Sequence, residues 1–401
     1  MDKNLEKQID EILTRGVTEV IDKENLKKRL LAGEKLRVKL GIDPTSSNIH
    51  LGRAVTLLKL RDLQQLGHQI VFIIGDFTAQ IGDTSDKESE RPMLSKETVE
   101  SNLRTYLQQA GKILDMNKVE SHRNSEWLGK LTYSEISEQA NIFSLAEFSA
   151  RENIRKRLTA GKRVSLREVL YPLMQGYDSV MIKADVEIGG TDQKFNILAG
   201  REMQKHFGQK PQDIILNELI EGIDGRKMSS SWGNTVNITD DPNTMFGKVM
   251  SVGDDLIVKY FISCTRVPLD EVEKIKKEMD DEKLNPRDAK LRLAGEIVKL
   301  YHGETESRKA RQYFINTFSK KEIPAEAPKF VVKGDSIKLA QLILESKNAK
   351  SLSDARRKIE QGGVSLDDEK ITDVQSVVTK EKDQKVLKIG KMGFVRIKFE
   401  K

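Results

Sequence analysis

The stretch RVKLGIDPTSSNIHLGR, residues 37–53, decides the fold of this chain. Its first part, RVKLGID, is typical of a strand, and apolar residues recur at helical spacing from His50 to Leu66. QIVFIIGDF, at 69–77, is a short apolar run that suits a buried parallel strand. A strand, a helix and a second strand in this order predict a βαβ unit.

A second βαβ unit is predicted further along the chain. Its parts are a strand at 179–190 (SVMIKADVEIGG), a helix at 191–207 (TDQKFNILAGREMQKHF) and a strand at 213–219 (DIILNEL). Between the two units, residues 95–176 have helical periodicity and few turn signals, which indicates an insertion carried on the sheet. We therefore expect an α/β protein with a Rossmann-like, doubly wound parallel sheet and a helical insertion.

Further domains are expected on either side of a linker. Residues 1–235 would form the sheet domain and residues 236–320 a helical domain, and the polar, proline-punctuated stretch at 321–334 predicts the linker. Residues 335–401 indicate two helices followed by strand-like alternation, which predicts a small α+β domain. This last part holds fifteen Lys or Arg against eleven Asp or Glu, in a chain whose net charge is +6.

The composition excludes several classes of protein. No stretch approaches the roughly 18 consecutive apolar residues of a transmembrane helix, and the first residues lack the apolar run of a signal peptide. Cys264 is the single cysteine, so no internal disulfide can form, and the five histidines have no partners at metal-ligand spacing. We therefore expect a cytoplasmic protein without structural zinc or membrane attachment.

Two segments have the features of a phosphate-binding site. In the turn that enters the first helix, Gly52 gives backbone clearance, the helix N-terminus attracts phosphate, and His50 could donate a ring N–H to a triphosphate. The loop DGRKMSSSWGN, 224–234, carries Arg226 and Lys227 and suits a mobile flap that closes on phosphates. Taken alone, each segment has an ordinary alternative, a capping histidine for the first and a hydrophilic surface loop for the second.

Together the two segments resemble the HIGH and KMSKS signatures of the class I aminoacyl-tRNA synthetases. Within that class the chain resembles the bacterial tyrosyl-tRNA synthetases over essentially its whole length. Five blocks carry this resemblance: LGIDPTSSNIHLG, IGDTSDKESER, YPLMQGYD, GGTDQKFN and KMSSS. It implies a tyrosine-tRNA ligase that activates L-tyrosine with ATP and Mg²⁺ and then transfers tyrosine to the 3′ end of tRNA(Tyr).

The resemblance also implies the role of each domain. Residues 1–235 would be the catalytic domain, 236–320 a helical domain on the anticodon side of the tRNA, and 335–401 an S4-like RNA-binding domain. A homodimer is expected, with helices around residues 125–165 at its interface.

The amino-acid pocket is assigned by resemblance to a YxxxQxxD helix. Tyr171, Gln175 and Asp178 are spaced so that all three project from one helical face. Asp178 would receive the substrate hydroxyl, Tyr171, Gln175 and Asp83 would hold the α-ammonium group, and Gln193 would lie near the carboxylate. Tyr171 and Gln175 could instead line a helix packing seam. A buried acceptor that phenylalanine leaves unpaired costs far more than a lost methylene, and a tyrosyl-tRNA synthetase is itself the reference case for this effect.

The resemblance assigns further residues to ATP, catalysis and RNA. The ATP-binding residues would be Asp43, Thr45, His50, Gly52, Asp192, Lys227, Met228, Ser229 and Ser230, with Asp192 on the ribose. The catalytic residues would be His50, Arg53, Lys87, Arg91 and Lys227, of which Lys87 and Arg91 belong to a loop that meets pyrophosphate and the tRNA acceptor end. The RNA-binding residues would be Arg356, Arg357 and Lys358, which fan out around a helix so that two can face phosphates.

Four positions depart from the family pattern. Arg53 replaces the second histidine of the first signature, and Ser230 replaces the second lysine of KMSKS. Losing that lysine removes a cation that would contact pyrophosphate, so we hypothesise that Arg53, Lys227, Lys87 and Arg91 share its role with a bound monovalent cation. Lys39 and Leu40 stand where many relatives carry a tyrosine-binding Tyr and a ribose-contacting Cys, which leaves open the group that shares the substrate hydroxyl with Asp178.

Three other functions compete with this interpretation. A tryptophanyl-tRNA synthetase would share the fold and both ATP signatures, but Asp178 and the S4-like tail favour tyrosine. A paralogue that only binds structured RNA would explain the changes at Arg53 and Ser230, but it would not keep Asp43, His50 and Asp192 intact. A small-molecule nucleotidyltransferase would leave the RNA-binding tail unexplained.

Overall fold

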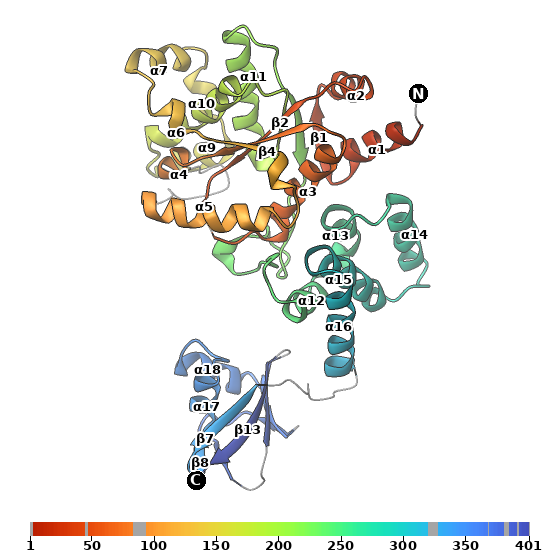
Figure 1. Cartoon of the computed structure of the whole chain (residues 1–401). Helices are drawn as coiled ribbons and strands as arrows, with labels where there is room; N and C mark the ends of the chain where they lie inside the picture. Colours follow the sequence, from red (N-terminus) through yellow and green to blue (C-terminus); the bar gives the residue numbers. More distant parts are fainter. Residues whose placement is uncertain are drawn as a thin grey trace. The chain divides into compact units, whose positions relative to one another are not determined.

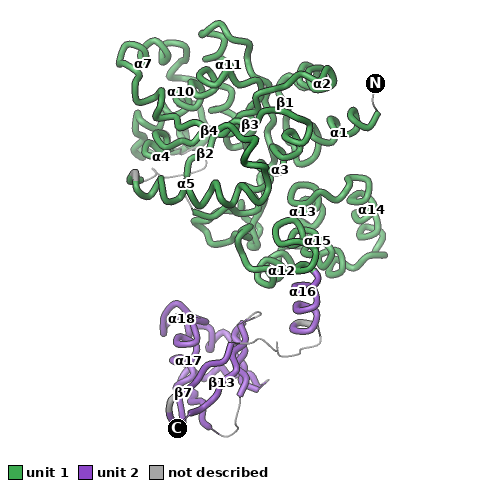
Figure 2. Tube along the Cα trace, in the orientation of Figure 1, with its two compact units in different colours: residues 1–307 green, residues 308–401 purple. Residues whose placement is uncertain are grey.

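A computed structural model describes most of the chain (Figure 1). The described residues are 3–44, 47–82, 94–319, 328–367, 369–380, 385–390 and 393–400. They fall into two compact units, residues 1–307 and residues 308–401 (Figure 2). Among the described residues, no helix combines the length and apolar character needed to cross a membrane.

Unit 1 is built on a six-stranded sheet in the order β1-β6-β5-β2-β3-β4. The strands are β1 (Val17–Ile21), β2 (Arg37–Ile42), β3 (Gln69–Ile74), β4 (Val119–Arg123), β5 (Val186–Gly190) and β6 (Asp213–Asn217). β1 pairs antiparallel with β6, and every other neighbouring pair is parallel. The Rossmann-like, doubly wound α/β fold is confirmed, because the chain leaves β2 towards β3 and leaves β5 towards β6 on the opposite side.

Helices cover this sheet and fill the segment between β4 and β5. They are α1 (Lys3–Thr14), α2 (Lys23–Leu31), α3 (Leu51–Gln65), α4 (Thr78–Ile81), α5 (Lys96–Ala110), α6 (Ser125–Leu128), α7 (Tyr133–Ala140), α8 (Leu145–Ser149), α9 (Glu152–Thr159), α10 (Leu166–Met181) and α11 (Lys194–His206). The longest of them, α10, begins with a capping box in which Ser165 accepts a backbone N–H and Glu168 returns the bond. Its outer residues pack against α11.

Two sequence expectations about this sheet were wrong in detail. The helical insertion expected at 95–176 contains β4, whose residues pair with β3 from Ile70 to Ile74. The strand expected at 179–190 is formed only by β5, because α10 continues through Met181 before the chain turns at Lys183, which has a left-handed φ of 52°. An apolar run such as SVMI fits a buried helix as well as a strand, so periodicity alone could not separate the two.

The remainder of unit 1 is mainly helical. It contains α12 (Pro242–Met250), α13 (Ile257–Cys264), α14 (Leu269–Asp280) and α15 (Pro286–His302), and α16 (Glu304–Phe314) begins in unit 1 and continues into unit 2. Asp241 caps α12 and Asn285 caps α15, each followed by a proline that suits the first helical turn.

Unit 2 contains a small α+β fold with its own core. A five-stranded sheet in the order β10-β9-β12-β13-β7 and a β11-β8 pair accompany two helices. These elements are β7 (Lys329–Lys333), β8 (Ser336–Lys338), α17 (Leu339–Glu345), α18 (Leu352–Glu360), β9 (Val364–Leu366), β10 (Glu369–Ile371), β11 (Val377–Thr379), β12 (Lys385–Ile389) and β13 (Gly393–Glu400). β7 lies within the stretch 321–334 that was expected to be a linker, and it pairs in parallel with β13.

Candidate active site

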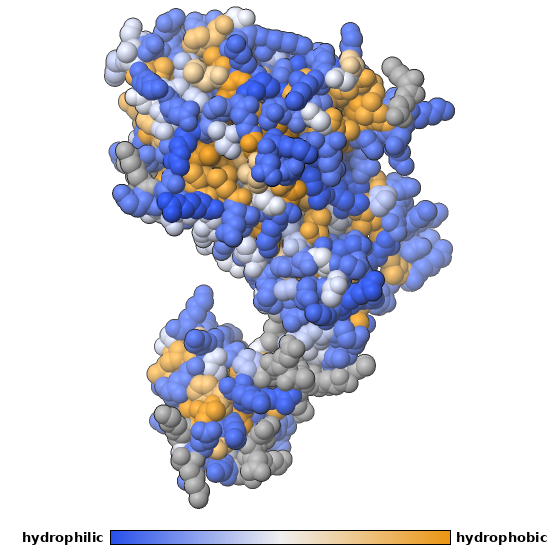
Figure 3. Space-filling view, viewed as in Figure 1, coloured by the Kyte–Doolittle hydropathy of each residue, from blue (hydrophilic) through white to orange (hydrophobic). Residues whose placement is uncertain are grey.

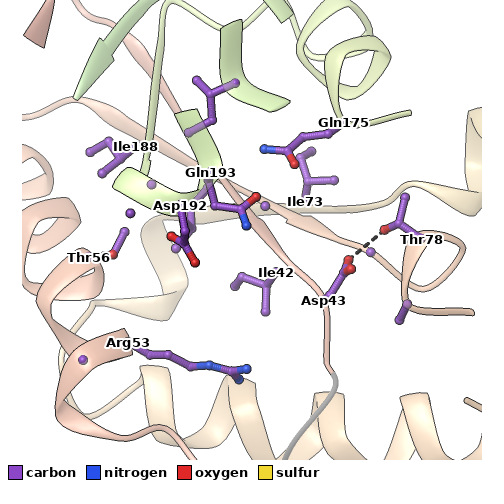
Figure 4. Close-up of a pocket in the computed structure, with 18 of the residues that line it drawn as sticks. Ile42, Asp43, Arg53, Thr56, Ile73, Thr78, Gln175, Ile188, Asp192 and Gln193 are labelled. Carbon is purple, nitrogen blue, oxygen red and sulfur yellow. Dashed lines mark hydrogen bonds between the residues drawn. The ribbon is translucent and has the colours of Figure 1, made fainter. Parts of the chain in front are cut away.

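A cavity of about 630 Å³ opens where β2 and β5 separate (Figure 4). These two strands pair only at Val38↔Val186 and Lys39↔Glu187, and beyond that point β2 continues beside β3. The strand order reverses here, which makes the carboxyl ends of the two strands the expected ligand crevice of a doubly wound sheet. The cavity is lined by residues of both sequence signatures and by Tyr171, Gln175 and Asp178 of α10.

At the inner end of the cavity, Asp178 is buried, and each of its carboxylate oxygens accepts one hydrogen bond from a neighbouring side chain. The indole of Trp127 donates to its Oδ1 at 2.8 Å, and the amide of Asn124 donates to its Oδ2 at 3.3 Å. Burial raises the pKa of Asp178 to about 7, while the Lys39 ammonium and the two hydrogen bonds act in the opposite direction. Each carboxylate oxygen keeps accepting capacity, so the group can still take a hydrogen bond from a phenol O–H in the cavity.

A hydrogen-bonded chain joins Asp178 to the end of β2. Asn124 also donates to the hydroxyl of Thr78 at 3.0 Å, and Thr78 donates to Asp43 Oδ1 at 2.8 Å. Tyr171 donates its phenolic O–H to Asp43 Oδ2 at 2.7 Å. A Cβ on Gly75 would lie 2.0 Å from Asp43 Oδ1, so only glycine leaves room for this carboxylate. The pocket end of α10 is thereby fixed to the sheet through polar contacts.

The second residue of the YxxxQxxD helix faces a buried carboxylate. Gln175 donates its side-chain N–H to Glu187 Oε1 at 3.1 Å, and its amide group points into the cavity (Figure 4). The two resemblance-based partners of the α-ammonium group that the structure describes, Tyr171 and Gln175, therefore lie in one polar wall. Asp83, the third, lies outside the described residues.

The outer end of the cavity brings the two ATP signatures together. The backbone of His50, at the start of α3, forms an isolated antiparallel β-bridge with that of Asn237. The backbone N–H of Gly52 donates to Met228 Sδ at 3.4 Å. A Cβ on Gly52 would lie 3.1 Å from His50 Nδ1, so glycine lets the imidazole stand close to the helix start. Gly52 and Met228, which are 176 residues apart in sequence, therefore lie side by side at this end of the cavity.

His50 is held as a neutral imidazole. Burial lowers its pKa to about 3, and the charges of Arg53 and Lys227 act in the same direction. Its Nδ1 is buried and has no hydrogen-bond partner in the described part of the chain. A neutral imidazole with an unused nitrogen can donate one N–H to a phosphate oxygen without carrying charge.

At the outer end of the cavity, the cationic side chains of Lys227 and Arg53 lie near Asp192 and the flap. The ammonium of Lys227 contacts Asp192 Oδ2 at 2.9 Å, and Arg53 extends from α3 into the cavity with Gln193 and Asp192 on the opposite wall (Figure 4). The flap conformation is fixed by Asn234, which accepts from the backbone N–H of Ser229 at 2.9 Å. Ser230 is exposed.

Some assigned residues could not be placed, and others were missed. Thr45, Lys87 and Arg91 join Asp83 outside the described residues. Asn124 and Trp127 were not predicted, although they share the short motif HRNSEW at 122–127, which begins in the last two residues of β4 and continues into α6. The polar residues directly after a strand were the available signal, but β4 itself was not recognised.

The RNA-binding candidates lie on α18 of unit 2. Arg356 and Arg357 are exposed, and Lys358 is half-buried. Arg357 contacts Asp354 at 2.5 Å, and Lys358 donates to the carbonyl of Asn348 at 2.6 Å. Arg356 has no ion pair within the described part of the chain. Among the three RNA-binding candidates it is therefore the side chain with the fewest existing partners.

The fold and this site define a class I aminoacyl-tRNA synthetase. A family model described as tRNA synthetases class I (W and Y) matches residues 31–319, and the chain belongs to this family. A second family model, described as the tyrosine–tRNA ligase SYY-like C-terminal domain, matches residues 320–395.

Within that class the chain belongs with the tyrosine–tRNA ligases. The tyrosine–tRNA ligase of Carboxydothermus hydrogenoformans is 46% identical, with 98% of each chain covered. That of Thermotoga maritima is 44% identical, with 96% of each chain covered. The bacterial tyrosyl-tRNA synthetase resemblance inferred from the sequence is thereby confirmed.

Solved structures share the same fold. A C-terminally truncated mitochondrial tyrosyl-tRNA synthetase of Aspergillus nidulans superposes with a TM-score of 0.64 at 20% identity, covering 78% of this chain and 94% of its own. The tyrosyl-tRNA synthetase of Archaeoglobus fulgidus, complexed with L-tyrosine, gives a TM-score of 0.61 at 23% identity, covering 77% and 99%. At these identities the likeness supports the fold alone.

Proposed function

We propose that this tyrosine–tRNA ligase selects its substrate at Asp178 and activates it with ATP at the cationic end of the same cavity. The observation that carries the proposal is a buried carboxylate, hydrogen-bonded by Trp127 and Asn124, in the cavity that the two ATP signatures line. Tyrosine would lie with its hydroxyl on Asp178 and its α-ammonium near Tyr171 and Gln175. Asp83 would complete the ammonium site.

Activation in this arrangement needs no general base. The tyrosine carboxylate is already ionised, so it attacks the α-phosphorus of ATP in line and expels pyrophosphate. His50 would donate an N–H to a phosphate oxygen, Lys227 would exchange Asp192 for the phosphates, and Asp192 would then bind the ribose. ATP enters as its Mg²⁺ complex, and the protein contributes position and charge stabilisation. A hydroxyl at the 3′ end of tRNA(Tyr) then attacks the carbonyl carbon of the adenylate, which forms the ester and releases AMP.

The cation arrangement at the flap is a separate part of the proposal. Ser230 supplies no charge, so Arg53 and Lys227, with Lys87, Arg91 and a monovalent cation, would take the role of the second signature lysine. We expect pyrophosphate exchange to be faster in potassium than in sodium buffer, and a Ser230→Lys variant to lose that difference. Equal rates for the unmodified enzyme in the two buffers would remove the cation from the proposal.

Amino-acid-dependent ATP–pyrophosphate exchange tests the substrate directly. The proposed function predicts exchange with tyrosine and none above background with tryptophan or phenylalanine. Exchange with tryptophan would favour the closest alternative within the class. No exchange with tyrosine would instead favour a chain that only binds RNA.

A homodimer is proposed from the apolar surface of unit 1. Tyr133, Leu145, Leu158 and Leu166 are between 50% and 88% exposed, on α7 to α10. Apolar surface also gathers around α6 and α9 in Figure 3. Isolated exposed leucines are ordinary, but several on neighbouring helices favour a protein interface. A second copy of the chain is the occupant we propose, because these helices lie in the segment assigned to the dimer by resemblance.

Sedimentation analysis tests the dimer. The wild type should sediment at twice 45.5 kDa, and Leu145→Asp with Tyr133→Asp should give the monomer mass. Leu352→Asp, a change at an exposed leucine of unit 2, is the matched control and should leave the dimer intact. A monomeric wild type at micromolar concentration would contradict the proposal.

In the cell, tRNA and ATP meet this enzyme in the cytoplasm, which is the compartment we propose.

A further inference from the structure

A fully buried ion pair lies directly behind the tyrosine end of the cavity. Lys39 Nζ contacts Glu187 Oε1 at 3.0 Å, and the two side chains are 0% and 1% exposed. The ammonium also donates to the carbonyl of Gln175 at 2.8 Å and to the hydroxyl of Ser179 at 2.7 Å. All three donors of Lys39 are therefore used, which is how a buried ammonium offsets the loss of its water shell.

Glu187 is equally well satisfied. It accepts from Gln175 at 3.1 Å, from Ser179 at 3.1 Å and from Gln212 at 2.5 Å, in addition to Lys39. Two of these partners, Gln175 and Ser179, lie on α10, on either side of Asp178 in sequence. The pair thus fixes the part of α10 that carries the tyrosine pocket.

The position of the pair in the sheet explains why it can act on the site. Lys39 of β2 and Glu187 of β5 are direct register partners, and theirs is the last pairing before the two strands separate to open the cavity. Their charges therefore lie at the floor of the crevice, between the sheet and α10. In a water-poor region of this kind, charges interact more strongly than at the surface.

The surroundings of Asp178 contain one positive and one further negative group. Lys39 from β2 attracts its negative charge and Glu187 from β5 repels it, while burial favours the protonated carboxyl. The other elements that face it contribute neutral donors, Trp127 of α6 and Asn124 just before it, and Asn124 connects through Thr78 to the carboxylate of Asp43. Burial therefore has the largest influence on the ionisation of Asp178, Lys39 opposes it most strongly, and the repulsion by Glu187 is weaker than the two hydrogen bonds.

We propose that the Lys39–Glu187 pair is a positioning device for substrate selection, in which Lys39 favours the ionised, accepting form of Asp178 and Glu187 holds Gln175 in the pocket wall. An ionised carboxylate left unpaired by phenylalanine is costly, whereas a protonated carboxyl tolerates an apolar ring better. Selectivity for tyrosine therefore follows the ionisation of Asp178. The inference rests on the proposed role of Asp178 and goes beyond it, since Lys39 does not line the cavity and Glu187, which does, is assigned a positioning role.

The test is the pH profile of the tyrosine-to-phenylalanine ratio of kcat/KM in pyrophosphate exchange, measured from pH 6 to 9.5. Lys39→Met removes the attraction, so the ratio should fall about tenfold or more at pH 7 and recover at high pH. Glu187→Gln removes the repulsion, so its profile should move to lower pH. The double variant Lys39→Met with Glu187→Gln should still lie at higher pH than the wild type, but by less than Lys39→Met alone, because the attraction of Lys39 outweighs the repulsion of Glu187.

A matched control separates this role from simple destabilisation. Lys59 is also buried, and it donates to the carbonyls of Ile12 and Arg15, remote in sequence from every residue named around Asp178. Lys59→Met should lower the melting temperature without moving the pH profile. If Lys39→Met does not fold, opposite shifts in Glu187→Gln and the double variant still test the proposal.

Two outcomes would overturn the inference alone, and a third would overturn the proposed function with it. Selectivity that falls equally at every pH in Lys39→Met, with no recovery in the double variant, would make the pair a packing element only. Asp178→Asn with unchanged selectivity would remove Asp178 itself from substrate recognition. If Asp178→Asn loses selectivity while the pH profile of Lys39→Met does not shift, only the proposed role of the Lys39–Glu187 pair is rejected.

Discussion

The two ends of the cavity differ in how their polar groups are held. At the tyrosine end, Asp178 is 3% exposed and is fixed by Trp127 and Asn124, and the side chains around it belong to β2, β5 and α10. At the phosphate end, the Lys227 side chain is 30% exposed and belongs to a flap. Under the proposed function, the substrate side chain would be recognised by preformed, buried contacts, whereas the phosphates would be stabilised by groups that can change partner.

The largest effect is expected for a substitution at the tyrosine end of the cavity. Asp178→Asn keeps the shape of the side chain but replaces one oxygen with a donor, so discrimination against phenylalanine should fall by at least about 100-fold. Competition between tyrosine and phenylalanine in pyrophosphate exchange measures it. Substitution of Lys227 or Ser230 in the flap should leave this ratio unchanged. If Asp178→Asn keeps the wild-type ratio, the proposed difference between the two ends of the cavity is wrong.

A large effect on rate, without one on selectivity, is expected at the phosphate end. Lys227→Ala removes a charged donor to the transferring phosphate, and losing one such group costs about 10² to 10³ in kcat. Single-turnover adenylate formation measures this loss. Arg226→Ala is the control, because Arg226 pairs with Asp224 and stacks over Trp232 outside the cavity lining. An equal loss in both variants would indicate a general disturbance of the flap.

An intermediate effect is expected on stability. The folded state raises the pKa of Asp178 from 3.8 to about 7, so the group favours folding below about pH 4 and loses this contribution as the pH rises to about 7. Asp178→Asn cannot titrate, so its melting temperature relative to the wild type should increase from pH 4.5 to pH 8. Asp224→Asn should show no such trend, because the pKa of Asp224 is lowered to about 2. A constant difference for Asp178→Asn would reject the assignment.

The smallest effect is expected for RNA binding by unit 2. Arg356→Ala should weaken tRNA(Tyr) binding only a few-fold and reduce the slope of log K against log salt by about one, which is the signature of one lost phosphate contact. Tyrosine activation should be unchanged. Lys283→Ala in unit 1 is the control for general charge. A salt slope equal to the wild type would place Arg356 outside the RNA-binding surface.

Local patterns predicted the parts of the fold that local sequence determines. β2, α3, β3 and β6 were predicted because each combines a clear apolar period with a turn signal. β4 was missed because VESHR is short and largely polar, and its pairing with β3 is a long-range contact. The end of α10 was missed because Val180 and Met181, followed by Ile182, form a short apolar run, which fits either structure.

The site was predictable to a similar extent. The signature residues were assigned by resemblance, since they lie in continuous blocks such as KMSSS and YPLMQGYD. Trp127 and Asn124 approach Asp178 across more than 50 residues, and Lys39 meets Glu187 only because their strands are neighbours. No spacing along the chain encodes such contacts, so the electrostatic environment of Asp178 required the structure.

The most direct test of the two-ended account is tyrosine binding in the absence of ATP, measured by calorimetry for the wild type and for Lys227→Ala. The account predicts that both bind tyrosine with similar affinity and reject phenylalanine, because the tyrosine end is complete without the phosphate end. Binding that requires ATP, or a Lys227→Ala variant that no longer distinguishes tyrosine from phenylalanine, would contradict it.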